Sequence, residues 1–514
     1  RKNMATTSTN GTPASASRTP NTTVGTPSAS TPSGGSSAAP AAGAATGGRD
    51  NFGKMATMAS PSKSSDGKSS DPRVDVKPSA TASNPTPAAA AKPTVDTAAR
   101  AAKTKALDPR ITFTRASTAT FVGSNGLIQT AASGAARFDH NPTTGESLGL
   151  LVEEARTNLT LYSGDFSQAH WSKISLSIFT ANTIIAPNGT LTGSFIAFEN
   201  ATAPLTSAKG LQPNTVMSAG TNTISCFAKI GTARYLALGL TNNSGETSTA
   251  VFDLQTGTVS GADSHPNFTV NGTSMVGAGA GWYRCSLTST YAAGMAGHIS
   301  SSTSGLSGVY GRDVSGNGTS GIYIWGAQIE AGSFPTSYIP TTSATVTRAA
   351  DVASMTGANF SSWFNGNKKG TLFFNHDLTP ETQYASNTNS MIVAFADSIF
   401  SYGNVIGYWG SGTARFLATN NYSATPAEAY NSGNFPAYGV TLSNPGYDKY
   451  ALAYTPGSGL SKAAINGVLL PAIDTPSAYI PTGFYFGGTH TQRIARLAYY
   501  PVRLPDAQLQ ALTL

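Results

Sequence analysis

The chain has 514 residues, a formal net charge of +7 and a charged fraction of 11%, well below the roughly 25% of ordinary soluble domains. Two cysteines are too few for a disulfide framework, and no run approaches the ~20 apolar residues of a membrane-spanning helix. The 54 glycines favour many turns and short strands over long helices.

The composition changes sharply near Lys105. Residues 1–105 consist mainly of Ala, Ser, Thr, Pro and Gly, and Phe52 is their only aromatic residue. They carry 13 Lys and Arg against 5 Asp, a net charge of +8, whereas the remaining residues carry 19 basic and 20 acidic groups, a net charge of −1. Such a segment cannot bury enough apolar surface to fold alone. We expect a basic, low-complexity, mostly irregular arm that anchors or links. Nucleic acid is an unlikely partner because the charges are spread singly.

Residues 106–160 are predicted to form a short lead segment of strands and turns. Short apolar runs begin at Ile111 and Ala119, and the run Asp139-His-Asn-Pro-Thr-Thr-Gly145 has Pro and Gly where β-turns favour them.

Residues 161–347 contain many short strand patterns separated by Gly and Asn, with no helical periodicity, which predicts a β-sandwich. Cys226 and Cys285 both fall in such strands. We expect two buried free thiols; a single bridge between neighbouring strands is the alternative. Trp282 and Trp325 are expected in the core.

Residues 348–514 again contain short strand patterns separated by turn residues, which predicts a second sandwich. Asn466-Gly467 between apolar runs is a strong signal for a tight hairpin. The end of the chain, from Pro505, is predicted to form a short helix with Leu509 and Leu512 on its apolar side. The fold class expected is therefore all-β, with two jelly-roll-type β-sandwiches after the arm.

Several runs resemble a segment common in bacteriophage structural proteins, where it precedes the carbohydrate-binding-like sandwiches of tail fibres, head fibres and other appendages. These runs are spread over residues 111–353, and they are Phe113–Phe121, Arg137–Leu159, Tyr162–Phe166, His170–Lys173, Trp325–Thr342 and Val346–Val352. Residues 348–514 resemble a concanavalin/laminin-G-type domain in the Asn466-Gly467 hairpin and in the run Ile494–Leu509.

The resemblance implies a virion structural protein on the surface of a phage particle, in a tail, neck or head fibre or as a decoration. It implies a homo-oligomer, by analogy a trimer, that binds host polysaccharide without cleaving it, while residues 1–105 contact other virion proteins. Two alternatives stay open. The sandwiches could decorate or cement the capsid or tail without binding glycan, or the protein could be a glycan-degrading tailspike.

Glycan sites stack sugars on exposed aromatic rings. Trp363, Trp409 and Tyr422 lie in polar, loop-like contexts and are the predicted glycan-binding residues. Packing at the edge of a sandwich is the alternative for each of them.

The sequence favours no catalytic or metal site. The six His residues show no paired metal spacing, and His140 is expected to make a local hydrogen bond in a turn or at the surface. Glu153 and Glu154 are adjacent, so they would point to opposite faces of a strand rather than flank a glycosidic bond; we expect one of them to meet Arg156 or Arg348. No enzyme activity and no cofactor are expected. Calcium stays a possibility without a supporting loop signature, its candidate ligands being Asp377, Asp397 and Asp448.

Overall fold

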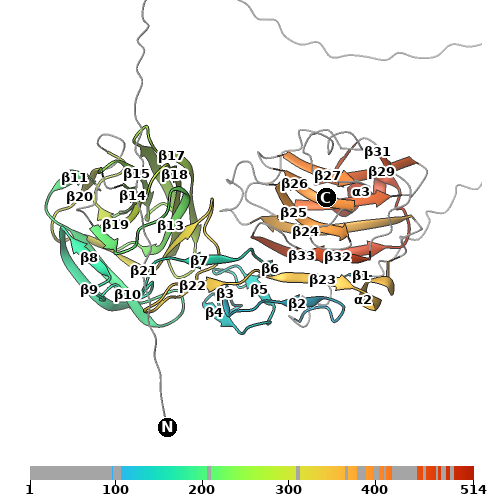
Figure 1. Cartoon of the computed structure of the whole chain (residues 1–514), viewed down its shortest axis with the longest axis horizontal. Helices are drawn as coiled ribbons and strands as arrows, with labels where there is room; N and C mark the ends of the chain where they lie inside the picture. The colour runs from blue at the N-terminus through green and yellow to red at the C-terminus, as the bar shows by residue number, and fades with distance from the viewer. Residues whose placement is uncertain are drawn as a thin grey trace, which may run out of the picture. The chain divides into compact units, whose positions relative to one another are not determined.

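The computed structural model describes Val95–Asp96 and residues 106–514, except for 205–209, 243, 308–312, 365–368, 379–388, 397–403, 410–412, 419–447, 455–458, 471–472, 476–481 and 487–490. These residues are almost entirely β-strand, and antiparallel sheets pack in pairs as two sandwiches (Figure 1). The expected all-β sandwich class is confirmed. The expected arm lies outside the described residues, apart from strand β1 (Val95–Asp96).

The first sandwich consists of two six-stranded sheets, green to yellow in Figure 1. One sheet has the order β17 (Thr269–Gly277), β18 (Trp282–Tyr291), β13 (Gly220–Lys229), β21 (Gly321–Ala331), β10 (Leu191–Phe198) and β9 (Leu176–Ile185). The other has the order β16 (Thr258–Ser264), β15 (Thr247–Asp253), β14 (Tyr235–Thr241), β19 (Ala296–Ser302), β12 (Gly210–Pro213) and β8 (Trp171–Ile174). A separate two-stranded sheet pairs β11 (Thr202–Pro204) with β20 (Asp313–Ser315).

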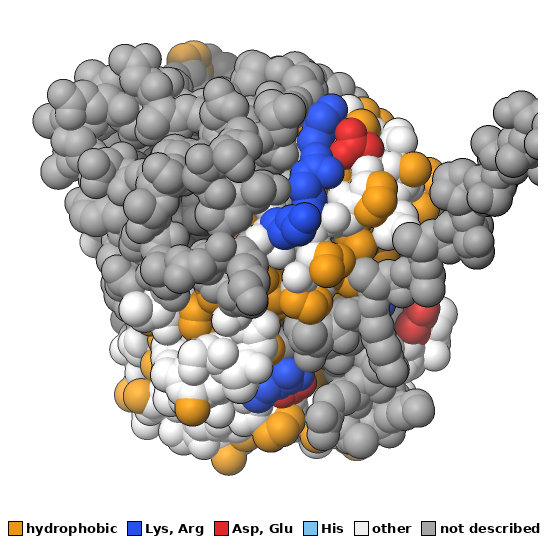
Figure 2. Space-filling view, turned by 90° about the vertical axis from the view of Figure 1, so that its right-hand side faces the viewer, with side chains coloured by type: hydrophobic (Ala, Val, Ile, Leu, Met, Phe, Trp, Pro, Cys, Tyr) orange, Lys and Arg blue, Asp and Glu red, His pale blue; other side chains and the backbone are white. Residues whose placement is uncertain are grey.

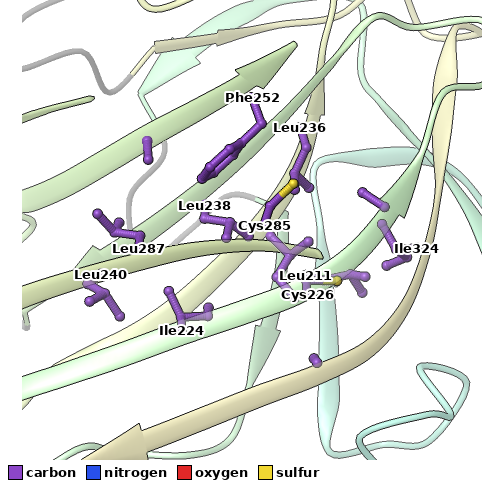
Figure 3. Packing of buried hydrophobic residues seen from close by; sticks show 14 of the residues in the cluster. Leu211, Ile224, Cys226, Leu236, Leu238, Leu240, Phe252, Cys285, Leu287 and Ile324 are labelled. Carbon is purple, nitrogen blue, oxygen red and sulfur yellow. The ribbon is translucent and has the colours of Figure 1, made fainter. Parts of the chain in front are cut away.

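Alternation along the strands builds the core of this sandwich. Leu236, Leu238 and Leu240 of β14 point inward, because side chains two residues apart share a face. They meet residues of the opposite sheet, among them Cys226 and Cys285 (Figure 3). The two cysteines are register partners on β13 and β18, and both are free and buried, as expected.

The second sandwich also pairs two sheets. The larger has the order β30 (Val468–Leu469), β29 (Gly459–Ile465), β28 (Asp448–Tyr454), β24 (Gly370–Leu378), β33 (Gln492–Tyr500), β6 (Ser147–Val152) and β5 (Arg137–His140), with β1 and β31 (Ile473–Thr475) on side branches. The smaller has the order β2 (Thr112–Thr114), β23 (Val352–Thr356), β32 (Gly483–Phe486), β25 (Asn389–Ala396), β26 (Asn404–Trp409) and β27 (Thr413–Ala418). Between them lies an apolar core that includes Phe374, Tyr450 and Phe484.

The lead segment does not stand apart from this second sandwich. Strand β6 pairs with β33, so that Leu150 is opposite Ile494, and β2 pairs with β23. The remaining lead strands form two small sheets, β3 (Ala119–Val122) with β4 (Ile128–Ala131), and β7 (Arg156–Asn158) with β22 (Val346–Arg348). Residues before and after the first sandwich in the sequence therefore complete the second one.

The predicted local features of the C-terminal region are present. Asn466 and Gly467 have φ of +46° and +78° in the turn between β29 and β30, which is the geometry of a type I′ hairpin. Helix α3 (Asp506–Thr513) follows Pro505 and buries Leu509 against the outer face of the larger sheet. The only other helix among the described residues is the short α2 (Ala358–Ser361). Neither helix is long enough to cross a bilayer.

The outer surface in Figure 2 is mixed rather than strongly charged. A short row of Lys and Arg side chains lies beside an acidic group, and hydrophobic side chains are scattered among polar ones. At the start of α3, Asp506 pairs with Arg503 at 3.3 Å and with Lys462 at 3.8 Å. Exposed pairs of this kind contribute at most about 1 kcal/mol each.

Candidate functional site

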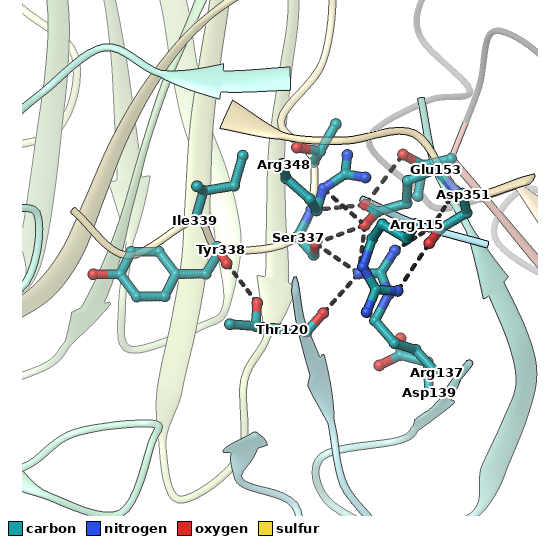
Figure 4. A network of polar contacts seen from close by, with 12 residues as sticks. Arg115, Thr120, Arg137, Asp139, Glu153, Ser337, Tyr338, Ile339, Arg348 and Asp351 are labelled. Atoms are coloured by element: carbon teal, nitrogen blue, oxygen red, sulfur yellow. Dashed lines mark hydrogen bonds and ion pairs between the residues drawn. The ribbon is translucent and has the colours of Figure 1, made fainter. Parts of the chain in front are cut away.

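A buried network of charged side chains joins the segments that flank the first sandwich. We call it the arginine–carboxylate network; its members are Arg115, Arg137, Glu153, Arg348 and Asp351 (Figure 4). Arg137 Nη1 lies 2.7 Å from Glu153 Oε2, and its Nη2 pairs with Asp351, which also binds Arg115 at 3.0 Å. Every one of these side chains is at most 1% exposed. Breaking such a buried pair is costly because it strands a charge away from water.

The network explains the two adjacent glutamates of the sequence. Burial opposes ionisation of Glu153, but attraction to Arg348 and Arg137 and hydrogen bonds from Ser337 outweigh it and hold its pKa well below the usual range. Glu154 instead pairs with Arg156. The predicted contact with Arg156 or Arg348 is confirmed, for both glutamates. Glu153 and Glu154 are therefore committed to structural ion pairs.

Beside this network lies a hollow of about 500 Å³, called here the larger hollow. It is bordered by the segment before β8, by the turn between β9 and β10, and by the segment after β21. Its volume falls in the range of small-ligand pockets, roughly 300–1,000 Å³. Its described lining residues are Thr120, Ile128, Thr130, Tyr162, Gly164, Asp165, Gln168, Asn188, Thr192, Trp325, Tyr338, Pro340, Thr341 and Thr342.

Tyr162 is held at this hollow in a strained conformation. Its φ is +49°, a region that costs a residue other than glycine about 1–3 kcal/mol and that clusters at functional sites. Its backbone N–H donates to the Thr342 carbonyl at 2.8 Å, and its carbonyl accepts from the Trp171 indole at 3.2 Å. These bonds fix the backbone on both sides of the ring.

Asp165 presents a preorganised carboxylate on the same border. Its Oδ1 accepts hydrogen bonds from the backbone and hydroxyl of Ser167, at 3.0 and 2.5 Å, and its Oδ2 accepts from the Gln168 amide at 2.8 Å. Burial opposes ionisation, but these bonds outweigh it and lower the pKa of Asp165. The carboxylate is therefore ionised at neutral pH and can accept hydrogen bonds from a ligand.

Gly164 leaves the wall of the larger hollow open. A Cβ placed on Gly164 would lie 3.4 Å from the Tyr338 hydroxyl and 3.5 Å from Trp325 Nε1. A methyl group would just fit, whereas a longer side chain would occupy the hollow. Trp325 is 3% exposed and packs against Tyr338, with ring centroids 4.7 Å apart. As expected, Trp325 and Trp282 are core residues, but Trp325 also lines the hollow.

A second cavity, the smaller hollow, has a volume of about 360 Å³ and shares Thr120, Ile128 and Tyr338 with the larger one. Its lining includes His140, Arg284, Phe227 and the ion pair of Asp139 with Arg493, whose Nε–Oδ2 distance is 2.7 Å. His140 ends strand β5 and is buried, and its Nδ1 lies 3.0 Å from the Val122 carbonyl. His140 thus makes a hydrogen bond, but to strand β3, 18 positions earlier in the chain, and the expected turn or surface position is wrong.

The predicted glycan-binding aromatics are not among these lining residues. Trp363 is 6% exposed and belongs to the core of the second sandwich, between Phe360, Phe364 and Tyr499. Its prediction as an exposed stacking platform is corrected, because its ring faces are covered by neighbours. Trp409 ends strand β26 rather than lying in a loop, and Tyr422 lies outside the described residues.

The calcium candidates gain no support. Asp377 belongs to β24 and Asp448 opens β28, while Asp397 lies outside the described residues. In the part of the chain that the structure describes, no three His, Cys, Asp or Glu side chains gather as metal ligands would.

Sequence reasoning missed both hollows. Asp165 and Gln168 fall in the run Tyr162-Ser-Gly-Asp-Phe-Ser-Gln-Ala-His-Trp, which drew attention only as part of the resemblance. The density of polar residues beside a Tyr and a Trp was the available signal. Asn188 is about 20 residues away along the chain, and only the fold brings it to the same border.

No protein-family model and no curated protein matches the chain. Solved structures with some similarity include the botulinum neurotoxin serotype D binding domain, at 12% identity over 32% of this chain and 40% of that one, with a TM-score of 0.24. The tandem CBM22 domain of Xyn10C from Paenibacillus barcinonensis has 8% identity, coverages of 68% and 99%, and a TM-score of 0.20. Domains LG4-5 of mouse laminin alpha1 have 11% identity, coverages of 59% and 91%, and a TM-score of 0.17. At these TM-scores the function has to be argued from the residues.

Proposed function

We propose that this chain is a bacteriophage virion appendage or decoration protein that attaches to host-surface glycans without cleaving them. The resemblance of its sequence runs to phage structural proteins supports the virion role. The larger hollow carries the glycan-binding role, since it combines aromatic rings with hydrogen-bonding side chains on a rigid sandwich.

The lining of the larger hollow matches the chemistry of a sugar. The half-buried Tyr162 ring offers apolar surface for the C–H face of a pyranose, whereas Trp325 is buried and only closes the wall of the hollow. The Asp165 carboxylate accepts hydrogen bonds from hydroxyl groups, while the amides of Gln168 and Asn188 both donate and accept. A few polar groups among aromatic rings fix the orientation of a ligand.

The same lining supports binding without hydrolysis. Asp165 is the one carboxylate among the described residues of the larger hollow, whereas a glycosidase requires two that flank the scissile bond. In the smaller hollow, Asp139 and Glu153 are both engaged in ion pairs with arginines. Attraction to Arg137 and Arg348 keeps Glu153 ionised, so it cannot serve as a general acid, and Asp139 is occupied by Arg493.

The remaining partners follow from the arm and from multivalency. Residues 1–105 hold the net positive charge of +8 and would contact other virion proteins, placing the sandwiches on the particle surface. A homotrimer, repeated over the virion, would strengthen weak individual sites through effective concentration.

A glycan array with the full chain tests the binding role. We expect the wild type to bind a glycan on the array. Gln168→Ala, Asn188→Ala and Gly164→Gln should each weaken its affinity for that glycan at least tenfold. Asn317→Ala is a matched control for Asn188→Ala, because both residues precede Gly-Thr and accept hydrogen bonds from the Thr backbone and hydroxyl, yet Asn317 lines neither hollow. Absence of binding by folded protein would overturn the glycan role and favour a purely structural one.

Imaging of particles labelled against this chain tests the virion role, with label on the head, neck or tail as the expected result. Deleting residues 1–94, which leaves strand β1 in place, should abolish incorporation and leave soluble sandwiches. Incorporation of the truncated chain would show that the arm is not the anchor.

A further inference from the structure

We propose that the smaller hollow is a subsite for a carboxylated sugar, such as a uronic acid, within the glycan bound at the larger hollow. This inference rests on the proposed glycan-binding function. The two hollows share Thr120, Ile128 and Tyr338 in their linings, so adjacent sugar units of one chain can occupy both.

Arg284 supplies an uncompensated positive charge. It lies on β18 and lines the smaller hollow, where its guanidinium sits 5.5 Å from the centroid of the Phe227 ring and donates to Ser225 Oγ at 3.2 Å. Its Nε is buried without a hydrogen-bond partner, and no described carboxylate pairs with it. The planar guanidinium is thus held in place by stacking, with donors to spare for a ligand carboxylate.

The charge around the smaller hollow is also in excess. Among the charged side chains that line it and their ion-pair partners, Arg493 is matched by Asp139, but Glu153 faces both Arg137 and Arg348. Arg137 also pairs with Asp351, which binds Arg115 as well, so that with Arg284 five arginines stand against three carboxylates. The excess of two positive charges favours entry of an anion.

His140 supplies an unpaired ring nitrogen in the same hollow. His140 is 4% exposed, and its Nε2 has no hydrogen-bond partner among the described residues. Since the Val122 carbonyl can only accept, Nδ1 carries a proton, and Nε2 is the ring nitrogen left for a ligand. An unsatisfied buried polar atom is expensive, and a sugar hydroxyl, which can both donate and accept, would satisfy it.

Together, Arg284 and His140 call for a ligand that carries both a carboxylate and a hydroxyl group. The Phe227 and Tyr338 rings add apolar walls, which suit a sugar ring better than a free inorganic anion. The volume of about 360 Å³ is at the lower end for a small-ligand pocket, which fits one terminal or branching sugar unit.

The test is the affinity of the full-length protein for two matched sugars, methyl α-glucuronoside and methyl α-glucoside, measured by ligand-observed NMR titration. The two sugars differ only at C6, where the glucuronoside has a carboxylate and the glucoside has a hydroxymethyl group. The wild type should bind the glucuronoside at least about tenfold more tightly, as a charge-assisted hydrogen bond allows. Arg284→Gln should abolish this preference, and Arg284→Lys should retain part of it.

Arg234→Gln is the matched control, because Arg234 lies in the same sandwich, pairs with Asp253 and lines neither hollow. It should leave the preference unchanged, and circular dichroism of each variant verifies folding. Equal affinity for the two sugars, or none for either, overturns the acidic subsite. The glycan array tests the broader function independently, since neutral glycans bound at the larger hollow would still register there.

Discussion

His376 makes the stability of the second sandwich sensitive to mild acid. It lies on β24 with 1% exposure, its ring packs 5.1 Å from Tyr450 and 5.6 Å from Phe374, and neither ring nitrogen has a hydrogen-bond partner among the described residues. Burial lowers its pKa from 6.5 to about 3. The folded protein therefore keeps a neutral ring at pH values where the unfolded chain has already taken up a proton.

The sign and size of the effect follow from linkage. Because the folded-state pKa lies below the unfolded one, stability is full above pH 6.5 and falls as the pH drops toward 3. Each pH unit in that window costs up to about 1.4 kcal/mol, so the loss between pH 8 and pH 5 is about 2 kcal/mol. Between pH 8 and pH 5, His376→Phe should therefore lose about 2 kcal/mol less of its unfolding free energy than the wild type loses.

Urea unfolding at pH 8, 6.5 and 5, followed by tryptophan fluorescence, measures the difference. Phe374→Leu is the control: it lowers stability at every pH by removing buried surface, but it keeps the titrating ring, so its pH dependence should match the wild type. An equal loss of stability on acidification in the wild type and in His376→Phe would refute the argument that His376 is buried as a neutral ring.

Three further outcomes follow from the packing. Arg137→Met should destabilise the fold by about 3–5 kcal/mol in urea, because it leaves two buried carboxylates each short of a partner; a change below 1 kcal/mol would contradict the buried network. Gly149→Ala should lower the free energy of unfolding by at least about 2 kcal/mol more than Gly134→Ala. An added Cβ would lie 2.3 Å from a backbone oxygen at Gly149, whereas it would meet nothing within 4 Å at Gly134. Both substitutions carry the strain of positive φ, so that strain cancels in the comparison. Cys226 and Cys285 should react with Ellman's reagent only after unfolding, because burial raises both thiol pKa values, that of Cys226 to about 12; fast reaction of the native protein would show that they are accessible.

The sequence predicted best what depends on neighbours along the chain. The alternation at Leu236, Leu238 and Leu240, the hairpin at Asn466-Gly467 and the terminal helix all follow from local patterning, and all are present. These features need only the periodicity of a strand or the backbone preferences of a turn.

The pairing of strands that lie far apart in the sequence could not be predicted from local patterns. Nothing in the local sequence of β6 indicates that Leu150 will pair with Ile494, more than 340 residues away. For the same reason the two hollows could not be predicted, because their linings come from segments that only the fold assembles. Trp363 shows the converse error: a polar neighbourhood in the sequence suggested exposure, but the ring turns inward to fill the core.

The central claim is that a glycan binds in the larger hollow. A crystal structure of the full chain soaked with the best ligand from the array tests it most directly. Sugar density against the Tyr162 ring in the larger hollow, with hydroxyl groups bonded to Asp165, is the predicted result. Density for the same ligand elsewhere on the sandwiches, with the larger hollow empty, would contradict the claim.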